Sequence, residues 1–323
     1  MTIHEAAYHG SLLADALAMP VHWYYDREAL DHDYPDLADF RNPLPHHPDS
    51  ILWRSEFTPL NEKANILHDQ APFWGQRNVH YHQNLKAGEN TVNFKLASAL
   101  YEQTKQHRNY DPERWVRHYI ELMLTPGWHR DTYLEEYHRA FFNRYAAGKD
   151  VLKCGISDEH IGGLATVPAL LAALPAGDHR QTVKTHVTLT HRHSNVLRAA
   201  DCLTRLLQHL SEGVPLHEAL MTQAGDWFST RKAEKWARQP DRVVVGQRLS
   251  PACYIDQSFP ASLYLAWKYH DDFPAAIIAN ALVGGDNCHR GAVVGALVAA
   301  EVQRATGSFN PDPFPSNGAP APA

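Results

Sequence analysis

Three short segments of the chain combine side chains that can bind metal ions or move protons. Gly88-Glu89-Asn90-Thr91 comes directly before an amphipathic stretch, and residues 284–291 read Gly-Gly-Asp-Asn-Cys-His-Arg-Gly before a run of small residues. The N-terminus of a helix leaves backbone N–H groups unpaired, so a polar loop there can hold an anion or a polar ligand. The third segment, residues 10–23, contains Asp15 and His22. These side chains indicate acid–base catalysis, metal binding, or both.

The candidate residues fall into two groups. Side chains with an acid, a thiol or an imidazole are candidates for catalysis: His22, Glu89, Asp286, Cys288 and His289. Other polar side chains of the three segments and their glycines are candidates for substrate binding: Asp15, Asn90, Thr91, Gly284, Gly285, Asn287 and Arg290. Glu89 and Asp286 are also the candidate metal ligands, because carboxylates suit a divalent ion.

Several candidates also have an ordinary structural interpretation. A short carboxylate such as Asp15 commonly caps or braces a helix, and a single histidine such as His22 is more often a hydrogen-bonded structural residue than a catalyst. Cys288 is either a small buried hydrophobic residue or, beside His289 near a helix N-terminus, a thiol with a lowered pKa. Arg290 is either a surface charge or a phosphate clamp. The sequence leaves these alternatives open.

Helical periodicity dominates the rest of the chain. Apolar side chains recur at intervals of three and four residues within 94–101, 116–123 and 197–210, which is the pattern of amphipathic helices. Asp111-Pro112-Glu113 is typical of a helix start, with a cap, a first-turn proline and an early acid. Strand-like sequence is confined to Val243-Val244-Val245. The sequence therefore predicts an all-α bundle.

Two stretches lack this periodicity. Residues 31–59 carry five prolines among polar residues, which predicts a long surface loop that could cover a site: Pro35, Pro43, Pro45, Pro48 and Pro59. Residues 309–323 are rich in proline and poor in bulky aliphatic residues, so we expect this tail to be disordered or draped over the surface. Residues 1–308 are expected to form a single domain.

Composition argues against several classes of function. The formal net charge of -6 provides no broad basic field, so nucleic acid is not an expected partner. We expect no export signal or membrane span, because no basic patch precedes an apolar core and the apolar stretches are interrupted by polar residues. The four cysteines form no closely spaced pair, which argues against a disulfide framework and favours the cytoplasm. The sequence does not fix the oligomeric state.

The order of the three segments resembles that of the ADP-ribosylglycohydrolase superfamily, which includes dinitrogenase reductase-activating glycohydrolase and the ADP-ribosylhydrolases. Residues 10–23 resemble the family's opening helix, and residues 88–91 stand where the family has Thr-Asp-Asp-Thr. Residues 284–289 are similar to its closing Gly-Gly-Asp-x-Asp-Thr motif. With further similarity over 190–210 and 258–277, the resemblance covers residues 8–305. It implies a compact orthogonal helical bundle in which both motif loops face one cleft, with Asp15 and His22 on the opposite wall.

The chain departs from the family at the positions that bind metal. Family enzymes hold two magnesium ions with the carboxylates of both motifs. Here Gly88, Glu89 and Asn90 replace Thr-Asp-Asp, Cys288 and His289 replace the second Asp-Thr, and His22 replaces a glutamate found in many members. Because magnesium prefers oxygen ligands, we expect no binuclear magnesium centre and at most one divalent ion, magnesium or another metal, weakly held.

The resemblance implies a hydrolase that cleaves an N- or O-glycosidic ribosyl linkage, in a small molecule or an ADP-ribosylated substrate. Glu89 and Asp286 would orient water or the ribose hydroxyls, and His22 or His289 would move a proton. Two alternatives stay open. One is a catalytically inactive protein of the same fold that binds ADP-ribose or another nucleotide, and the other is a thiol-dependent transfer through Cys288. The leaving group is not fixed by the sequence.

Overall fold

The computed structural model describes residues 1–312 and 314, and this part of the chain contains helices but no β-strand. The prediction of an all-α fold is confirmed. The longer helices are α1 (Ile3–Ala18), α3 (Val92–His107), α4 (Pro112–Leu124), α5 (Glu136–Ala146), α8 (Ser194–Ser211), α12 (Ile255–Lys268), α13 (Phe273–Leu282) and α14 (Asn287–Thr306). The shorter ones are α2 (Arg27–Asp33), α6 (Val167–Ala173), α7 (Arg180–Thr188), α9 (Leu216–Gln223), α10 (Thr230–Trp236) and α11 (Asp241–Val243). Single turns such as η1 (Met19–Val21), η2 (Leu52–Arg54) and η6 (Ile161–Leu164) connect them.

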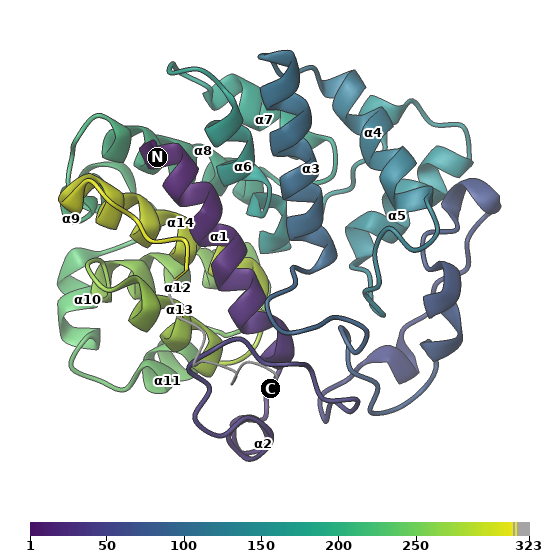
Figure 1. Ribbon diagram of the computed structural model, residues 1–323, viewed down its shortest axis with the longest axis horizontal. Coiled ribbons are helices and arrows are strands. Elements are labelled where there is room, and N and C mark those ends of the chain that lie inside the picture. The colour runs from purple at the N-terminus through teal and green to yellow at the C-terminus, as the bar shows by residue number, and fades with distance from the viewer. Residues whose placement is uncertain (313, 315–323) are drawn as a thin grey trace, which may run out of the picture.

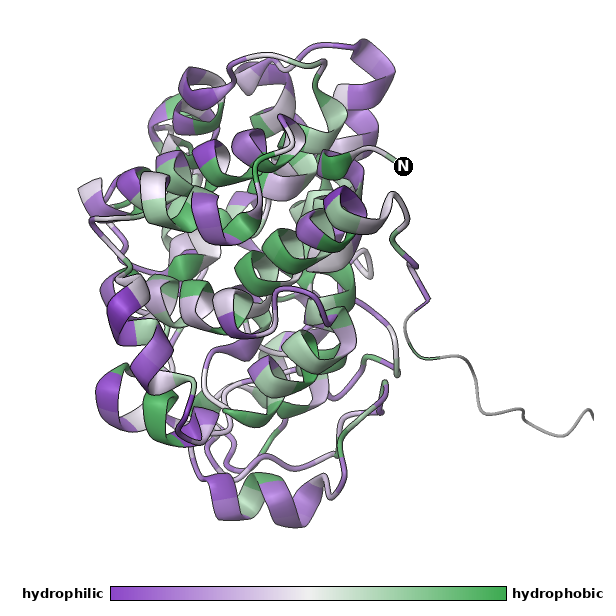
Figure 2. Cartoon of the chain, turned by 90° about the vertical axis from the view of Figure 1, so that its left-hand side faces the viewer, coloured by the Kyte–Doolittle hydropathy of each residue, from purple (hydrophilic) through white to green (hydrophobic). Residues whose placement is uncertain are grey.

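The first and last long helices pack together at the centre of the bundle. In Figure 1, α1 crosses the middle of the molecule with α14 beside it, and α3, α4 and α5 lie on the other side of α1 from α9 and α10. The two backbones touch, because a Cβ built on Gly295 would lie 2.2 Å from the carbonyl oxygen of Gly10. Apolar residues gather on these central helices, while polar residues prevail at the periphery (Figure 2). This contact fixes the C-terminal end of α1 beside the N-terminal end of α14.

The valine run at 243–245 does not form the strand suggested by its sequence. It continues α11 into an irregular helical turn, η7 (Val244–Arg248), which is kinked at Val245 and at Gly246, where φ is +146°. A strand needs a partner for its backbone N–H and C=O groups, and the neighbouring segments are helical. Val244 and Val245 instead bury their β-branched side chains in the core.

The two non-periodic stretches follow the outside of the bundle. Between α2 and η2 the chain is largely irregular, as predicted, but it is anchored by buried side chains such as Leu37 and His47. At the start of the tail, Phe309 packs edge-on against Phe273 with a ring-centroid distance of 4.8 Å. This part is therefore draped on the bundle, and the rest of the expected tail, 313 and 315–323, lies outside the described residues. Within those described ranges, no helix has the length and apolarity that a bilayer-spanning segment requires.

Candidate functional site

The glycine pair before α14 brings two distant parts of the chain together. Gly284 and Gly285 both have positive φ values, +74° and +68°, and a Cβ on Gly284 would lie 2.4 Å from the carbonyl oxygen of Tyr24. The backbone N–H of Gly285 donates to that same oxygen, and its carbonyl accepts from the N–H of Trp23. Only glycine tolerates this close approach and backbone conformation without strain. The loop after η1 and the loop before α14 are therefore held side by side.

Asp286 lies at the centre of a buried network of polar side chains. Its Oδ1 atom is 2.9 Å from His22 Nε2 and 2.7 Å from His289 Nδ1. Its Oδ2 atom is buried, has no hydrogen-bond partner among the residues that the structure describes, and lies 3.4 Å from His160 Nε2. Burial alone would raise the pKa of Asp286, but the neighbouring His289 and His160 bring it well below its ordinary value. Asp286 is thus an ionised carboxylate with one oxygen free to accept.

One arm of the network runs from Asp286 through two stacked histidines to a second acid. His22 Nδ1 is 2.8 Å from His82 Nε2, and His82 Nδ1 is 2.8 Å from Asp131 Oδ1. The indole of Trp23 stacks on the His22 ring at a centroid distance of 3.8 Å. Burial lowers the pKa of His22 to about 3, against the opposing effect of Asp286. Its imidazole is therefore uncharged near neutral pH.

The second arm runs from Asp286 through His289 to Glu135. His289 Nε2 is 3.2 Å from Glu135 Oε1 and 2.9 Å from Asn93 Nδ2, and this amide also donates to Glu135 at 3.0 Å. Burial would lower the pKa of His289, but Asp286 and Glu135 raise it to about 10. The same ion pair outweighs the burial of Glu135 and lowers the pKa of that carboxyl. In the absence of another cation, His289 is a charged bridge between two carboxylates.

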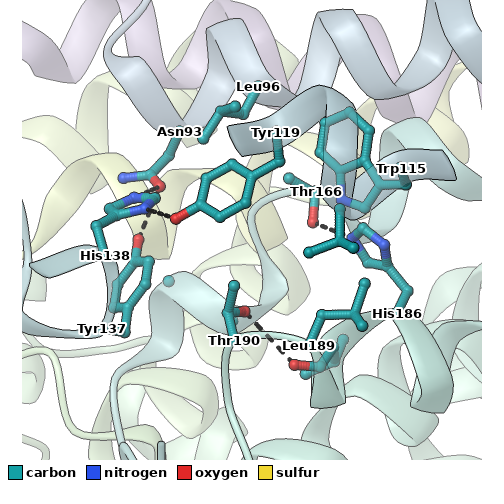
Figure 3. Close-up of a pocket in the computed structure, with 14 residues that line it drawn as sticks. Asn93, Leu96, Trp115, Tyr119, Tyr137, His138, Thr166, His186, Leu189 and Thr190 are labelled. Atoms are coloured by element: carbon teal, nitrogen blue, oxygen red, sulfur yellow. Dashed lines mark hydrogen bonds between the residues drawn. The ribbon is translucent and has the colours of Figure 1, made fainter. Parts of the chain in front are cut away.

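Beyond Asn93 the second arm ends at a small cavity lined by polar and apolar side chains (Figure 3). Asn93 Oδ1 accepts from the Tyr137 hydroxyl at 2.7 Å and lies 2.9 Å from His138 Nε2. His138 Nδ1 is in turn 2.6 Å from the Tyr119 hydroxyl. These residues line a cavity of about 40 Å³, which is room for one or two water molecules but not for a nucleotide. The cavity is therefore too small to be the site of a nucleotide substrate.

The network approaches the surface at a different place, beside Asp286 Oδ2. His160 is slightly exposed, with 11% of its side chain accessible, and Cys253 is partly exposed. One ligand-type atom from each of His160, Cys253 and Asp286 lies within 4.8 Å of the other two. Tyr25, which is 44% exposed, stands close enough to Asp286 and Cys253 for their charges to affect its hydroxyl. The Oδ2 side of Asp286 is therefore the side that faces partly exposed residues.

The side chains of the first motif loop contact Asp15 and Arg130. Asp15 accepts hydrogen bonds from Asn90 Nδ2, Thr91 N and Thr91 Oγ1 at 2.8–2.9 Å, so it braces the N-terminus of α3. Burial raises the pKa of Asp15 to about 6. Glu89 instead pairs with Arg130 where both side chains are about 40% exposed, and among the described residues no contact joins Glu89 to Asp286. The ion pair with Arg130 sets the orientation of the Glu89 side chain.

The remaining second-motif residues hold the loop itself. Cys288 is buried with Sγ 3.8 Å from the backbone oxygen of Asp15, and burial raises its pKa well above the ordinary value. Asn287 Nδ2 donates to the carbonyls of residues 21 and 281. Arg290 is fully buried and donates to the Asn280 side chain and to the carbonyls of residues 280 and 284. Of the twelve candidates, His22, Asp286 and His289 are in mutual contact at the centre.

The residues present do not fit a pair of magnesium ions. Such a site needs several anionic or carbonyl oxygens, but Glu89, Asn90 and Thr91 are engaged elsewhere and Asp286 faces imidazole nitrogens. The groups that could hold a metal here are two sets sharing Asp286: one with His22 and His289, the other with His160 and Cys253. Both sets are richer in nitrogen or sulfur than magnesium prefers.

Sequence reasoning missed the outer members of the network. His82, Asp131, Glu135, Asn93 and His160 lie on loops or helices outside the three segments. One signal was present: 22 histidines are an unusual number for 323 residues. Nothing in their spacing shows that five of them gather around one site.

Comparison with known proteins gives a consistent relationship. A family described as ADP-ribosylglycohydrolase matches residues 5–303. Crystallin J1A from Tripedalia cystophora is 23% identical over 303 residues, which is 92% of this chain and 87% of that protein. A solved structure titled ADP-ribosylglycohydrolase-related protein complex has a TM-score of 0.54 at 20% identity, covering 92% of this chain and 88% of the other. That likeness supports the fold alone.

Proposed function

The chain belongs to the ADP-ribosylglycohydrolase family, and we propose that it hydrolyses an N- or O-glycosidic bond between an ADP-ribose-like group and its carrier. The observation that carries this proposal is the Oδ2 atom of Asp286. It is a buried carboxylate oxygen without a hydrogen-bond partner, and it faces His160 on the side of the network nearest the surface. A free anionic oxygen of this kind can accept from a ribose hydroxyl or from the attacking water.

The contacts around Asp286 suggest a division of roles. His22 and His289 hold Oδ1 and thereby fix the carboxylate, while Oδ2 stays available to substrate. Its negative charge would stabilise the positive charge that develops at the anomeric carbon as the glycosidic bond breaks. His160 Nδ1 accepts from the N–H of Gly162 at 2.8 Å, so the imidazole carries its hydrogen on Nε2 and can donate it to a bound oxygen. Glu89, paired with Arg130, has no role in this scheme.

Release of ADP-ribose tests the proposal. Peptides ADP-ribosylated on arginine or on serine would be incubated with the purified chain, with chelator and with added divalent metals, and free ADP-ribose would be measured by chromatography. We expect time-dependent release that is lost in Asp286→Asn and kept in Glu89→Gln. Absence of release from every substrate, with and without metals, would overturn the proposal.

A second candidate is a protein that binds ADP-ribose without cleaving it. It is favoured by the burial of His22, Asp286 and His289, in which both histidines contact the Oδ1 atom of Asp286. Calorimetry distinguishes the two: ADP-ribose binding without turnover of any ADP-ribosylated peptide supports the binder. A cytoplasmic location and a partner other than nucleic acid remain predictions from composition.

A further inference from the structure

The arm from Asp286 to Asp131 holds fewer hydrogens than it has contacts. Its three contacts, Asp286 to His22, His22 to His82 and His82 to Asp131, span 2.9, 2.8 and 2.8 Å. Each needs a hydrogen or another positive centre between its two electronegative atoms. A neutral imidazole carries one N–H group, so two neutral histidines supply two hydrogens. The remaining contact is filled either by one additional proton or by a metal ion.

The direction of these hydrogen bonds indicates where that cation belongs. Asp131 can only accept, so His82 places its hydrogen on Nδ1 and leaves Nε2 to accept from His22 Nδ1. The lone pair of His22 Nε2 then points at Asp286 Oδ1, 2.9 Å away. Two ligands at roughly 2.0–2.1 Å from one metal ion are about 2.9 Å apart at right angles and about 3.3 Å apart in a tetrahedral arrangement. The spacing between His22 and Asp286 therefore suits two neighbouring ligands of one ion.

His289 meets the same Asp286 oxygen from the other side. Its Nδ1 atom is 2.7 Å from Oδ1, and Glu135 lies 3.2 Å from its Nε2 atom. With the hydrogen on Nε2 and donated to Glu135, the lone pair of Nδ1 faces the ion. When Nε2 carries the hydrogen, the Asn93 amide, 2.9 Å from that atom, would donate to Glu135 alone. His289 is thus backed by a carboxylate directly and His22 is backed by Asp131 through His82, and partners of this kind commonly orient metal-ligating histidines.

The charges and the unpartnered oxygens of the network agree with a divalent ion. Asp286, Asp131 and Glu135 are all buried, and one oxygen of each lacks a hydrogen-bond partner in the described residues. Arg290 is close enough to Asp286, and Lys95 close enough to Asp131, for each cation to offset part of this charge. Negative charge left in the interior without a counter-ion is costly, and a bound cation would offset it when His289 is neutral.

The alternative set around Asp286 Oδ2 is less suited to a metal. His160 is the N-cap of η6, and its Nδ1 atom accepts from the Gly162 N–H. Its hydrogen is therefore on Nε2, the atom that faces Asp286, and a protonated nitrogen has no lone pair for a metal. Cys253 and Asp286 alone do not complete a site. Two imidazole nitrogens and one carboxylate, in contrast, are a ligand set typical of first-row transition metals.

We propose that the chain binds one divalent first-row transition-metal ion through His22 Nε2, His289 Nδ1 and a carboxylate oxygen of Asp286. The pair His82 and Asp131 orients the first histidine, and Glu135 orients the second. This site differs in number and in ligand chemistry from the two magnesium ions that the family implies. It concerns metal binding and stands whether or not the chain cleaves ADP-ribose.

Cobalt is a suitable probe, because its visible absorption reports ligand binding directly. The full chain would be stripped with a chelator and titrated with Co²⁺, followed by competition with Zn²⁺. We expect one ion per chain, and at least 100-fold weaker binding in His22→Gln and in Asp286→Asn. His160→Gln is the matched control: His160 also contacts Asp286, but its replacement should leave the cobalt affinity unchanged. Circular dichroism verifies that each variant is folded.

Asp131→Asn tests the outer shell, and it keeps the proposal falsifiable if His22→Gln does not fold. Loss of an outer partner typically weakens metal binding 10- to 100-fold, and we expect a loss in that range. The proposal is overturned if the folded chain binds no stoichiometric Co²⁺, if His160→Gln loses binding while His22→Gln keeps it, or if Asp131→Asn binds like the unmodified chain. Cobalt binding without ADP-ribose release would refute the proposed function and leave the metal site standing.

Discussion

Asp15 allows a quantitative test of how burial and hydrogen bonding compete in this fold. Three hydrogen bonds from Asn90 and Thr91, and the N-terminus of α3, favour its charged form. Complete burial favours the neutral form and prevails, since the pKa rises from 3.8 to about 6. Asp15→Asn retains the shape of the side chain and removes the charge.

The sign and size of the effect follow from linkage. The unfolded chain loses this proton near pH 3.8 and the folded chain near pH 6, so the folded state binds more protons between these values. Its stability therefore falls as the pH rises through this window. A shift of about 2 units corresponds to about 3 kcal/mol, which is the amount by which ionised Asp15 destabilises the fold above pH 6. An asparagine does not titrate and escapes this loss.

Denaturant unfolding of both proteins at several pH values measures the difference. Relative to the unmodified chain, Asp15→Asn should gain about 2–3 kcal/mol of unfolding free energy between pH 4 and pH 7, with no further gain above pH 7. Subtracting the two curves removes the groups that titrate identically in both proteins. A difference that does not change with pH, or that turns against the asparagine variant as the pH rises, would show that the helix terminus and the hydrogen bonds outweigh burial.

Three further predictions concern the packing and the motif residues. Gly295→Ala should lower the free energy of unfolding by about 1–3 kcal/mol or more, because the new Cβ would lie 2.2 Å from the Gly10 carbonyl oxygen. A variant that melts at the same temperature as the unmodified chain would contradict this close contact between α1 and α14. Cys288, buried with a raised pKa, should resist iodoacetamide at pH 8 until the chain is denatured. Rapid labelling of Cys288 itself in the native protein would restore the hypothesis of a thiol-dependent transfer. Glu89→Gln should change stability by at most about 1 kcal/mol and leave cobalt binding intact, because its carboxylate pairs with Arg130; weaker cobalt binding would return Glu89 to the metal site.

Most of the fold could be predicted from sequence because its helices carry their own signals. Asp111 caps α4 by accepting from the N–H of Arg114, with Pro112 as the first helical residue, as its sequence indicates. The exception, residues 243–245, has strand-like residues but no neighbouring strand to pair with. Local propensity cannot report the absence of a partner elsewhere in the chain.

The site was predictable in part, for a related reason. Asp286 and His289 follow the glycine pair at the entrance of α14, and His22 is a candidate through the resemblance to the family; the structure brings these three side chains into contact. The partner of Glu89 was not predictable, since its carboxylate pairs with Arg130, 41 residues away in the sequence. Similarly, Asp131 reaches the network only through His82, a tertiary contact that no local pattern encodes.

The rate of ADP-ribose release by the unmodified chain and by Asp286→Asn, at equal concentrations of folded protein and on the same ADP-ribosylated peptide, tests the proposed function most directly. The account predicts steady release by the unmodified chain and a decrease of at least about 100-fold in the variant, the range expected when a group acting in proton transfer is removed. Equal rates in the two proteins would contradict it, because the reaction would then not depend on the carboxylate around which the whole network is built.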